Sequence, residues 1–111
     1  MAAGVVWRVE LDHLPAIAAG MEGKAGRIVR KAALDIQAHA QNRAPVQTGT
    51  LRASIRVQQV GPTHARVVVG ADYGLYVEMG TRHTRAQPYL GPAVTAVKGS
   101  FLAAMRKVAQ A

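Results

Sequence analysis

The basic run Arg82–Arg85 holds the residues best suited to binding chemistry. Two guanidinium groups and the imidazole of His83 can contact phosphate or carboxylate oxygens, although a solvated loop is the plainer interpretation. Arg82, His83 and Arg85 are therefore candidates for contact with DNA or with an acidic neighbour. The surrounding segment, Gly80 to Gln87, has no large apolar anchor, so we expect it to be mobile in the isolated subunit.

Glu78 is the second candidate, because it lies in an otherwise apolar segment, Tyr73 to Met79. A carboxylate that loses contact with water needs a compensating partner. We expect that partner to be internal, either Arg52 or the turn at Thr48 to Thr50. A salt bridge to another protein is the alternative.

The other polar residues do not form a catalytic or metal-binding pattern. The two serines, Ser54 and Ser100, lack a nucleophile elbow and an acid–base pair, and there is no cysteine. The Thr48–Thr50 turn lacks the lysine and spacing of a phosphate loop. The four histidines, His13, His39, His64 and His83, are scattered along the chain. His39 lies near the apolar face of a predicted helix and is expected in the core or in an interface. We expect no enzyme activity, no metal and no cofactor.

Length and charge set the class of protein. The 111 residues fit one domain, 1–111, and the net charge is +8. Acids are missing between Asp35 and Asp72 and after Glu78, which favours an anionic partner, either nucleic acid or an acidic protein surface. A basic surface that only maintains solubility is the alternative. The apolar run Leu14 to Met21 is too short to cross a membrane, and the first residues lack a signal-peptide pattern, so we expect a cytoplasmic location.

The first half of the chain alternates between strand and helix patterns. Period-two alternation from Val5 to Asp12 predicts a strand with one buried face. Apolar residues at steps of three and four predict a long helix over about Lys24 to Arg43, which Pro45 ends. A structured turn follows. Alternation on either side of Gly61–His64 then predicts a β-hairpin, with a bulge at Gln59-Val60.

The second half is predicted to be helical. A short helix over Tyr73 to Met79 would be capped by Asp72 and ended by Gly80, and Pro92 would open a last helix. The apolar stripe of that last helix is Val94, Val97, Phe101, Met105 and Val108. The whole order predicts an α+β fold: a small antiparallel sheet, made of the N-terminal strand plus the β-hairpin, packed against the long helix, with a short helix and a C-terminal helix.

Two motifs flank the predicted hairpin. Ala44 to Arg52 reads A-P-V-Q-T-G-T-L-R, and Tyr73 to Ala93 contains Y-G-L-Y-V-E-M-G-T and Q-P-Y-L-G-P-A. Together they resemble a family of minor structural proteins of tailed bacteriophages that act in head–tail joining and tail completion. That family shows A-P-V-D-T-G-x-L-R, a hairpin, Y-A-x-Y-V-E-x-G-T, a variable loop and Q-P-F-L-R-P-A. The residues matched as structural are Pro45, Thr48, Gly49, Leu51, Arg52, Tyr73, Tyr76, Glu78, Gly80, Thr81, Pro88, Tyr89 and Pro92.

The departures from the family pattern are few. Gln47 stands where an acid is common, Gly74 where alanine is usual, Tyr89 where phenylalanine is usual, and Gly91 where the residue is often basic. The resemblance implies a virion protein without catalytic residues. It would form a homo-oligomeric ring at the phage neck, joining the head connector to the tail and letting genomic DNA pass. The alternative is a free, basic, sequence-independent DNA-binding protein, for which no helix-turn-helix pattern is visible.

Overall fold

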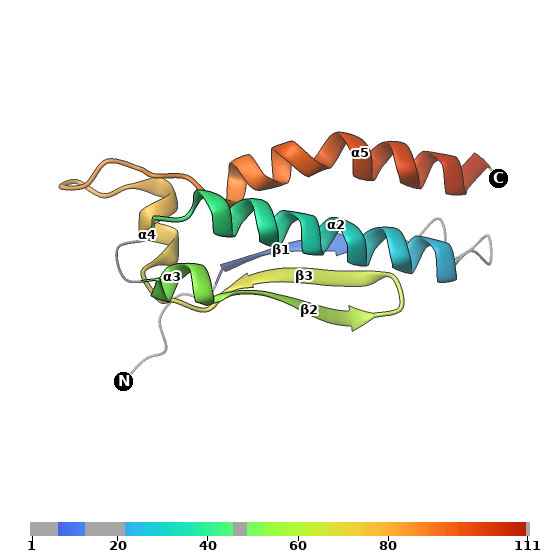
Figure 1. The fold of residues 1–111 in the computed structure, drawn as a ribbon, viewed down its shortest axis with the longest axis horizontal. Helices are drawn as coiled ribbons and strands as arrows, with labels where there is room; N and C mark the ends of the chain where they lie inside the picture. The colour runs from blue at the N-terminus through green and yellow to red at the C-terminus, as the bar shows by residue number, and fades with distance from the viewer. Residues whose placement is uncertain (1–6, 13–21, 46–48, 111) are drawn as a thin grey trace.

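The computed structural model describes residues 7–12, 22–45 and 49–110 (Figure 1). Predictions about Val5, His13, the run Leu14 to Met21 and Thr48 lie outside these residues. The elements follow the order strand, long helix, short helix, two strands, short helix, long helix. They are β1 (Trp7–Asp12), α2 (Glu22–Arg43), α3 (Thr50–Ala53), β2 (Ile55–Gly61), β3 (His64–Val69), α4 (Gly74–Met79) and α5 (Leu90–Gln110).

The strands form one antiparallel sheet in the order β1-β3-β2. Val69 of β3 pairs with Trp7 on one side and with Ile55 on the other. The predicted bulge is confirmed, because the β2–β3 pairing shifts register between Gln59 and Gly61. Alternate residues of β3 are fully buried, which gives the sheet one apolar face; they are Ala65, Val67 and Val69.

Helix α2 covers that apolar face and lies between α5 and the hairpin strands (Figure 1). Its buried stripe is rich in alanine, and small side chains let the helix approach its neighbours closely. The buried members are Ala25, Val29, Ala32, Ala33, Ile36 and Ala40. The helix ends at Arg43, as Pro45 predicts. His39 is exposed on α2, so the expectation of a core histidine is wrong and only an interface position remains.

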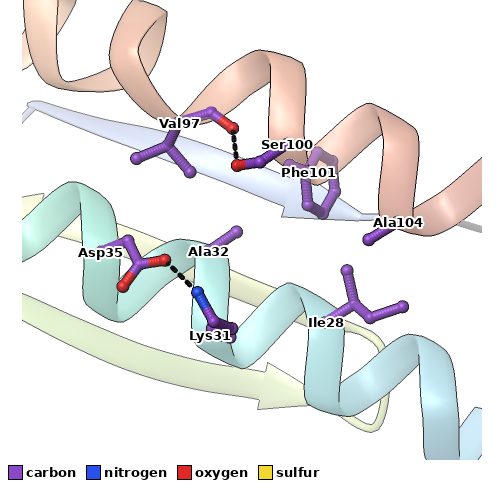
Figure 2. Close-up of a pocket in the computed structure, with 8 residues that line it drawn as sticks. All are labelled: Ile28, Lys31, Ala32, Asp35, Val97, Ser100, Phe101 and Ala104. Atoms are coloured by element: carbon purple, nitrogen blue, oxygen red, sulfur yellow. Dashed lines mark hydrogen bonds and ion pairs between the residues drawn. The ribbon is translucent and has the colours of Figure 1, made fainter.

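Helix α5 runs antiparallel to α2, and its predicted stripe is confirmed. Val97, Met105 and Val108 are buried, while Val94 and Phe101 are partly buried against the core. A small groove of about 230 Å³ lies between the two helices. Figure 2 shows Phe101 facing Ile28 across it. The α+β fold is therefore confirmed. Helix α3 is an addition, since that stretch was predicted only as a turn.

Candidate functional site

The two sequence motifs meet in space at one end of the molecule, which we call the tip (residues 49–53 and 73–92; Figure 1). Gly74 lies at the junction. A Cβ atom at this position would lie 3.4 Å from Leu51 Cδ1, 2.8 Å from Tyr89 Oη and 2.5 Å from Val69 Cγ1. Glycine at residue 74 therefore lets the first motif, the sheet and the second motif pack together without a gap.

Glu78 holds the start of α5. Its carboxylate accepts hydrogen bonds from the backbone N–H groups of Tyr89 (2.9 Å), Leu90 (2.8 Å) and Gly91 (3.0 Å). The first N–H groups of a helix lack intrahelical acceptors, and a negative charge there is favoured by the helix dipole. The expected internal role is thus observed, but with backbone N–H groups as partners and not with Arg52, which is exposed on α3. The other expected partner, the turn at Thr48 to Thr50, lies partly outside the described residues. Sequence spacing alone does not show that α4 reaches α5.

Tyr89 ties the N-terminal strand to the tip. Its side chain is fully buried, and its hydroxyl donates to the carbonyl oxygen of Gly74 (2.8 Å) and accepts from Trp7 Nε1 (3.1 Å). The two rings meet edge to face, with centroids 6.2 Å apart. Burial raises the pKa of Tyr89 to about 12, the Trp7 hydrogen bond opposes this, and the nearby Glu78 carboxylate adds to it. The hydroxyl therefore stays protonated and remains a donor.

The loop after α4 has a closed stem. The N–H of Gly80 donates to the Tyr76 carbonyl (2.8 Å), and the N–H of Gln87 donates to the Val77 carbonyl (2.8 Å). Gly80 has φ 79° and ψ 171°, a region open essentially to glycine. It ends α4 as predicted. The other end of α4 differs from the prediction, because Tyr73 occupies the cap position, no side chain caps it, and Asp72 is exposed.

Inside the stem, Thr81 organises a turn. Its hydroxyl accepts from the N–H groups of His83 (3.2 Å) and Thr84 (3.1 Å), and its own N–H donates to the Thr84 carbonyl (2.9 Å). These bonds partly offset the entropy of ordering the loop. The segment therefore has internal contacts that its lack of a large apolar anchor did not suggest. Mobility of this loop in the isolated subunit stays a prediction.

The outer surface of α4 is apolar and unusually exposed. Tyr73 is 38%, Tyr76 55% and Met79 71% exposed, at the three-residue spacing that places them on one side of the helix. Beside them, α3, α4 and the loop enclose a groove of about 490 Å³. Its lining residues are Pro45, Thr50, Leu51, Tyr73, Val77, Thr84, Arg85 and Gln87.

The remaining candidates fall around this surface. Arg82, His83 and Arg85 are all exposed on the loop beside Met79, so the structure brings the basic run and the apolar surface together. Pro88 is exposed. Pro92 lies in the first turn of α5, which begins two residues earlier at Leu90, and its missing N–H would have had no intrahelical acceptor there.

The sequence reasoning missed the structural roles of Gly49 in backbone conformation and of two glutamines in hydrogen bonding. Gly49 precedes α3 with φ 73°, a left-handed conformation that favours glycine. Gln37 of α2 donates its side-chain amide to the Ile55 carbonyl at 2.9 Å, where α3 gives way to β2. Gln41, one helical turn later, makes longer contacts with the carbonyls of Arg52 and Ile55. Two glutamines four residues apart were the available signal for this support.

Glu10, on β1, carries the main charge cluster of the sheet. It contacts His64 and pairs with Arg8, and Arg66 Nε lies 3.5 Å from it. The hydrogen bond from His64, then that from Arg8, lowers the pKa of Glu10, with a smaller contribution from the charge of Arg66. Within the described ranges, no three metal-ligating side chains gather, and no helix is long and apolar enough to cross a membrane.

Comparison with known proteins adds one match. The family model described as "HK97-gp10_like: Bacteriophage HK97-gp10, putative tail-component" matches residues 11–80, more than half of the chain. The matched stretch runs from the end of β1 to Gly80 and so includes both the Ala44–Arg52 motif and α4. No curated protein and no solved structure matches the chain.

Proposed function

The chain belongs to the HK97-gp10-like family of bacteriophage tail components, and from that premise we propose that it is a subunit of the head–tail interface. In this proposal it assembles as a homo-oligomeric ring in the neck or at tail completion. The ring joins the head connector to the tail and lets genomic DNA pass. Family membership makes the protein a phage structural protein of the virion; the ring, its position and the DNA passage are the proposed part.

The observation that carries the proposal is the composition of the tip. Tyr73, Tyr76 and Met79 are exposed next to Arg82 and Arg85. Tyrosine, methionine and arginine are enriched at protein interfaces, and aromatic and arginine side chains supply much of their binding energy. Beneath them, Glu78 and Tyr89 fix α4 against α5 through buried hydrogen bonds. A contact surface on such a rigid base loses little entropy on binding.

A ring also needs a second surface, because head-to-tail contacts join two different patches on each copy. On the two long helices of the described chain, the exposed large apolar side chains are Leu34 of α2 and Leu102 of α5. Both residues lie outside the tip, which supports a contact surface separate from it. Arg82, His83 and Arg85 would then contribute to the protein contact at the tip.

Particles made without this protein, and then with variants of it, test the proposal. We expect loss of the protein to leave filled heads and tails unjoined in electron micrographs. Supplying Tyr76→Ser/Met79→Ser should fail to restore joined particles, although both side chains are exposed and the domain should fold. Val60→Ser, at 46% exposure and outside both proposed contact surfaces, is the matched control for removing an exposed apolar side chain.

The outcomes separate the parts of the proposal. Joined particles with the double tip variant would remove the tip from assembly. Failure with Val60→Ser alone would move the contact to the β2–β3 hairpin. Joined, infective particles without any copy of the protein would overturn the head–tail role itself. Sedimentation of the purified wild-type protein and of the tip variant then shows whether the loss is one of self-assembly.

A further inference from the structure

Cationic side chains gather at the end of the molecule opposite the tip. Helix α2 begins, α5 finishes and the β2–β3 turn closes at this same end (Figure 1). Val108 of α5 and Lys24 and Arg27 of α2 line one shallow hollow, so the two helix ends lie against each other. We call the set the cationic end. Its members, all exposed, are Lys24, Arg27, Arg30, Lys31, Arg106 and Lys107.

These charges are held together at a cost. Lys24 is the third residue of α2, where the helix dipole disfavours a cation. Arg27 has a like charge three residues away on both sides, Lys24 and Arg30, and such pairs destabilise a helix. Among the side chains that the structure describes, Lys31 is the one member with a carboxylate partner, Asp35 at 2.7 Å (Figure 2). An external anion would relieve the repulsion among the others.

The surface between α2 and the hairpin turn is hollowed. Arg27 and Arg30 border a depression of about 620 Å³ whose floor includes Gly23 and Gly26, which have no side chains. A Cβ atom at Gly26 would lie 2.3 Å from the carbonyl oxygen of Pro62, so glycine is what lets the turn approach the helix. The result is a concave surface flanked by two guanidinium groups.

We propose that the cationic end binds the phosphate backbone of duplex nucleic acid without reading its sequence. The run from Lys24 to Lys31 extends about 10 Å along the helix. Over that length a duplex carries about six phosphate charges. Val60, in the β2 bulge, is the large apolar side chain exposed at this end of the described structure. An acidic protein partner would be expected to meet aromatic or methionine anchors, whereas surfaces that bind nucleic acid are dominated by positive charge.

The inference deepens the DNA-passage part of the proposed function, on which its biological meaning rests. It also assigns the two ends different partners: protein at the tip, and DNA at the cationic end. The sequence analysis marked Arg82, His83 and Arg85 as candidates for contact with DNA or with an acidic neighbour. Their place beside Tyr76 and Met79 favours protein for them instead.

Fluorescence anisotropy with two labelled DNA duplexes of unrelated sequence, over a series of salt concentrations, tests the proposal. Wild-type protein should bind both duplexes equally, and the logarithm of the binding constant should fall linearly with that of the salt concentration. Each phosphate contact contributes roughly 0.9 to the slope, so Arg27→Ala/Arg30→Ala, which removes two contacts, should reduce the slope by about 1.8 and weaken binding roughly tenfold. Arg82→Ala/Arg85→Ala, which removes the same charge at the tip, should leave the slope unchanged. Circular dichroism checks that both variants fold.

Each other result overturns the proposal. Equal losses in the two variants would mean that binding reflects net charge alone. A loss confined to the tip variant would place DNA on the loop. Binding to polyglutamate but not to either duplex would indicate an acidic protein partner. The assembly proposal is tested separately. If the salt slopes behave as expected but the tip variants still give joined particles, the proposed DNA surface stands and the proposed tip contact is overturned.

Discussion

The two ends of the molecule differ in which side chains they bury and which they expose. The tip buries the polar groups of Glu78 and Tyr89, which hydrogen-bond to the chain itself, and exposes apolar side chains. The cationic end exposes charges of which, among the described side chains, Lys31 alone has a carboxylate partner, and it rests on one close backbone approach, at Gly26. Short-range packing contacts need fixed geometry. Electrostatic attraction to a polyanion acts over a Debye length and does not need fixed geometry. The difference therefore matches the two kinds of partner proposed.

The largest expected effect tests whether the tip is held by Glu78. Glu78→Ala leaves the N–H groups of Tyr89, Leu90 and Gly91 without their acceptor, and we expect a loss of about 3 kcal/mol in the free energy of unfolding. Urea denaturation measures it. Asp35→Ala, which removes an exposed, surface-paired carboxylate, should change stability by no more than ~0.5 kcal/mol. Equal effects of the two variants would mean that the tip is no more fixed than the surface of α2.

Gly74 and Tyr89 should act as a coupled pair within the tip. Gly74→Ala brings a Cβ close to Tyr89 Oη and Val69 Cγ1, and we expect a loss of about 2 kcal/mol. Tyr89→Phe gives up the bonds to Gly74 and Trp7, at about 1–2 kcal/mol. Because removing the hydroxyl also makes room for the methyl group, the double variant should be more stable than the sum predicts by about 1 kcal/mol. Strict additivity in the double-mutant cycle would show that the crowding is relieved elsewhere.

The cationic end should be sensitive at one backbone contact. Gly26→Ala improves helix propensity by about 1 kcal/mol but pushes a methyl group against the Pro62 carbonyl, so we expect a net loss of about 1 kcal/mol. Gly99→Ala, inside α5 with nothing within 4 Å, should instead stabilise by up to ~1 kcal/mol. Thermal unfolding of the pair provides the comparison. Stabilisation by both substitutions would show that the hairpin turn is not seated on α2.

The smallest effect concerns the sheet, where charges do have internal partners. The hydrogen bonds from His64 and Arg8 hold the pKa of Glu10 below its usual value of 4.5. The carboxylate therefore contributes stability that is complete above pH 4.5 and is lost as the pH falls through the lowered pKa. In an NMR titration, His64→Gln should move the pKa of Glu10 upward. An unchanged titration curve would show that His64 does not stabilise the charge.

The sequence predicted the elements whose pattern is local. Periodicity gave β1, α2, the hairpin and α5, and the break in alternation at Gln59-Val60 gave the bulge. These signals work because burial of one face imposes a period of two or of 3.6 residues on the chain. The two motifs likewise indicated the phage tail family, which the match over residues 11–80 bears out.

The errors had two causes: segments too short to show a period, and contacts between elements distant in the sequence. Helix α3 has only four residues, too few for a period, and the Asp72 cap was inferred from residue type alone. Glu78 was expected to need an internal partner, but its partner is the start of α5, eleven to thirteen residues along the chain. The cationic end was invisible because charges on α2 and α5 come together only through the antiparallel packing of the two helices.

The closed stem of the loop has a consequence for how such a protein can diversify. Gly80 and Gln87 are bonded to neighbouring carbonyls of α4, so the two ends of the loop are fixed side by side whatever lies between them. Closing a longer segment between fixed ends costs little, about 0.6 kcal/mol for each doubling of its length. We therefore expect residues 81–86 to tolerate changes of sequence and length. Insertions, exchanges or engineered epitopes there can redirect the tip to a new neighbour while the fold beneath is inherited unchanged.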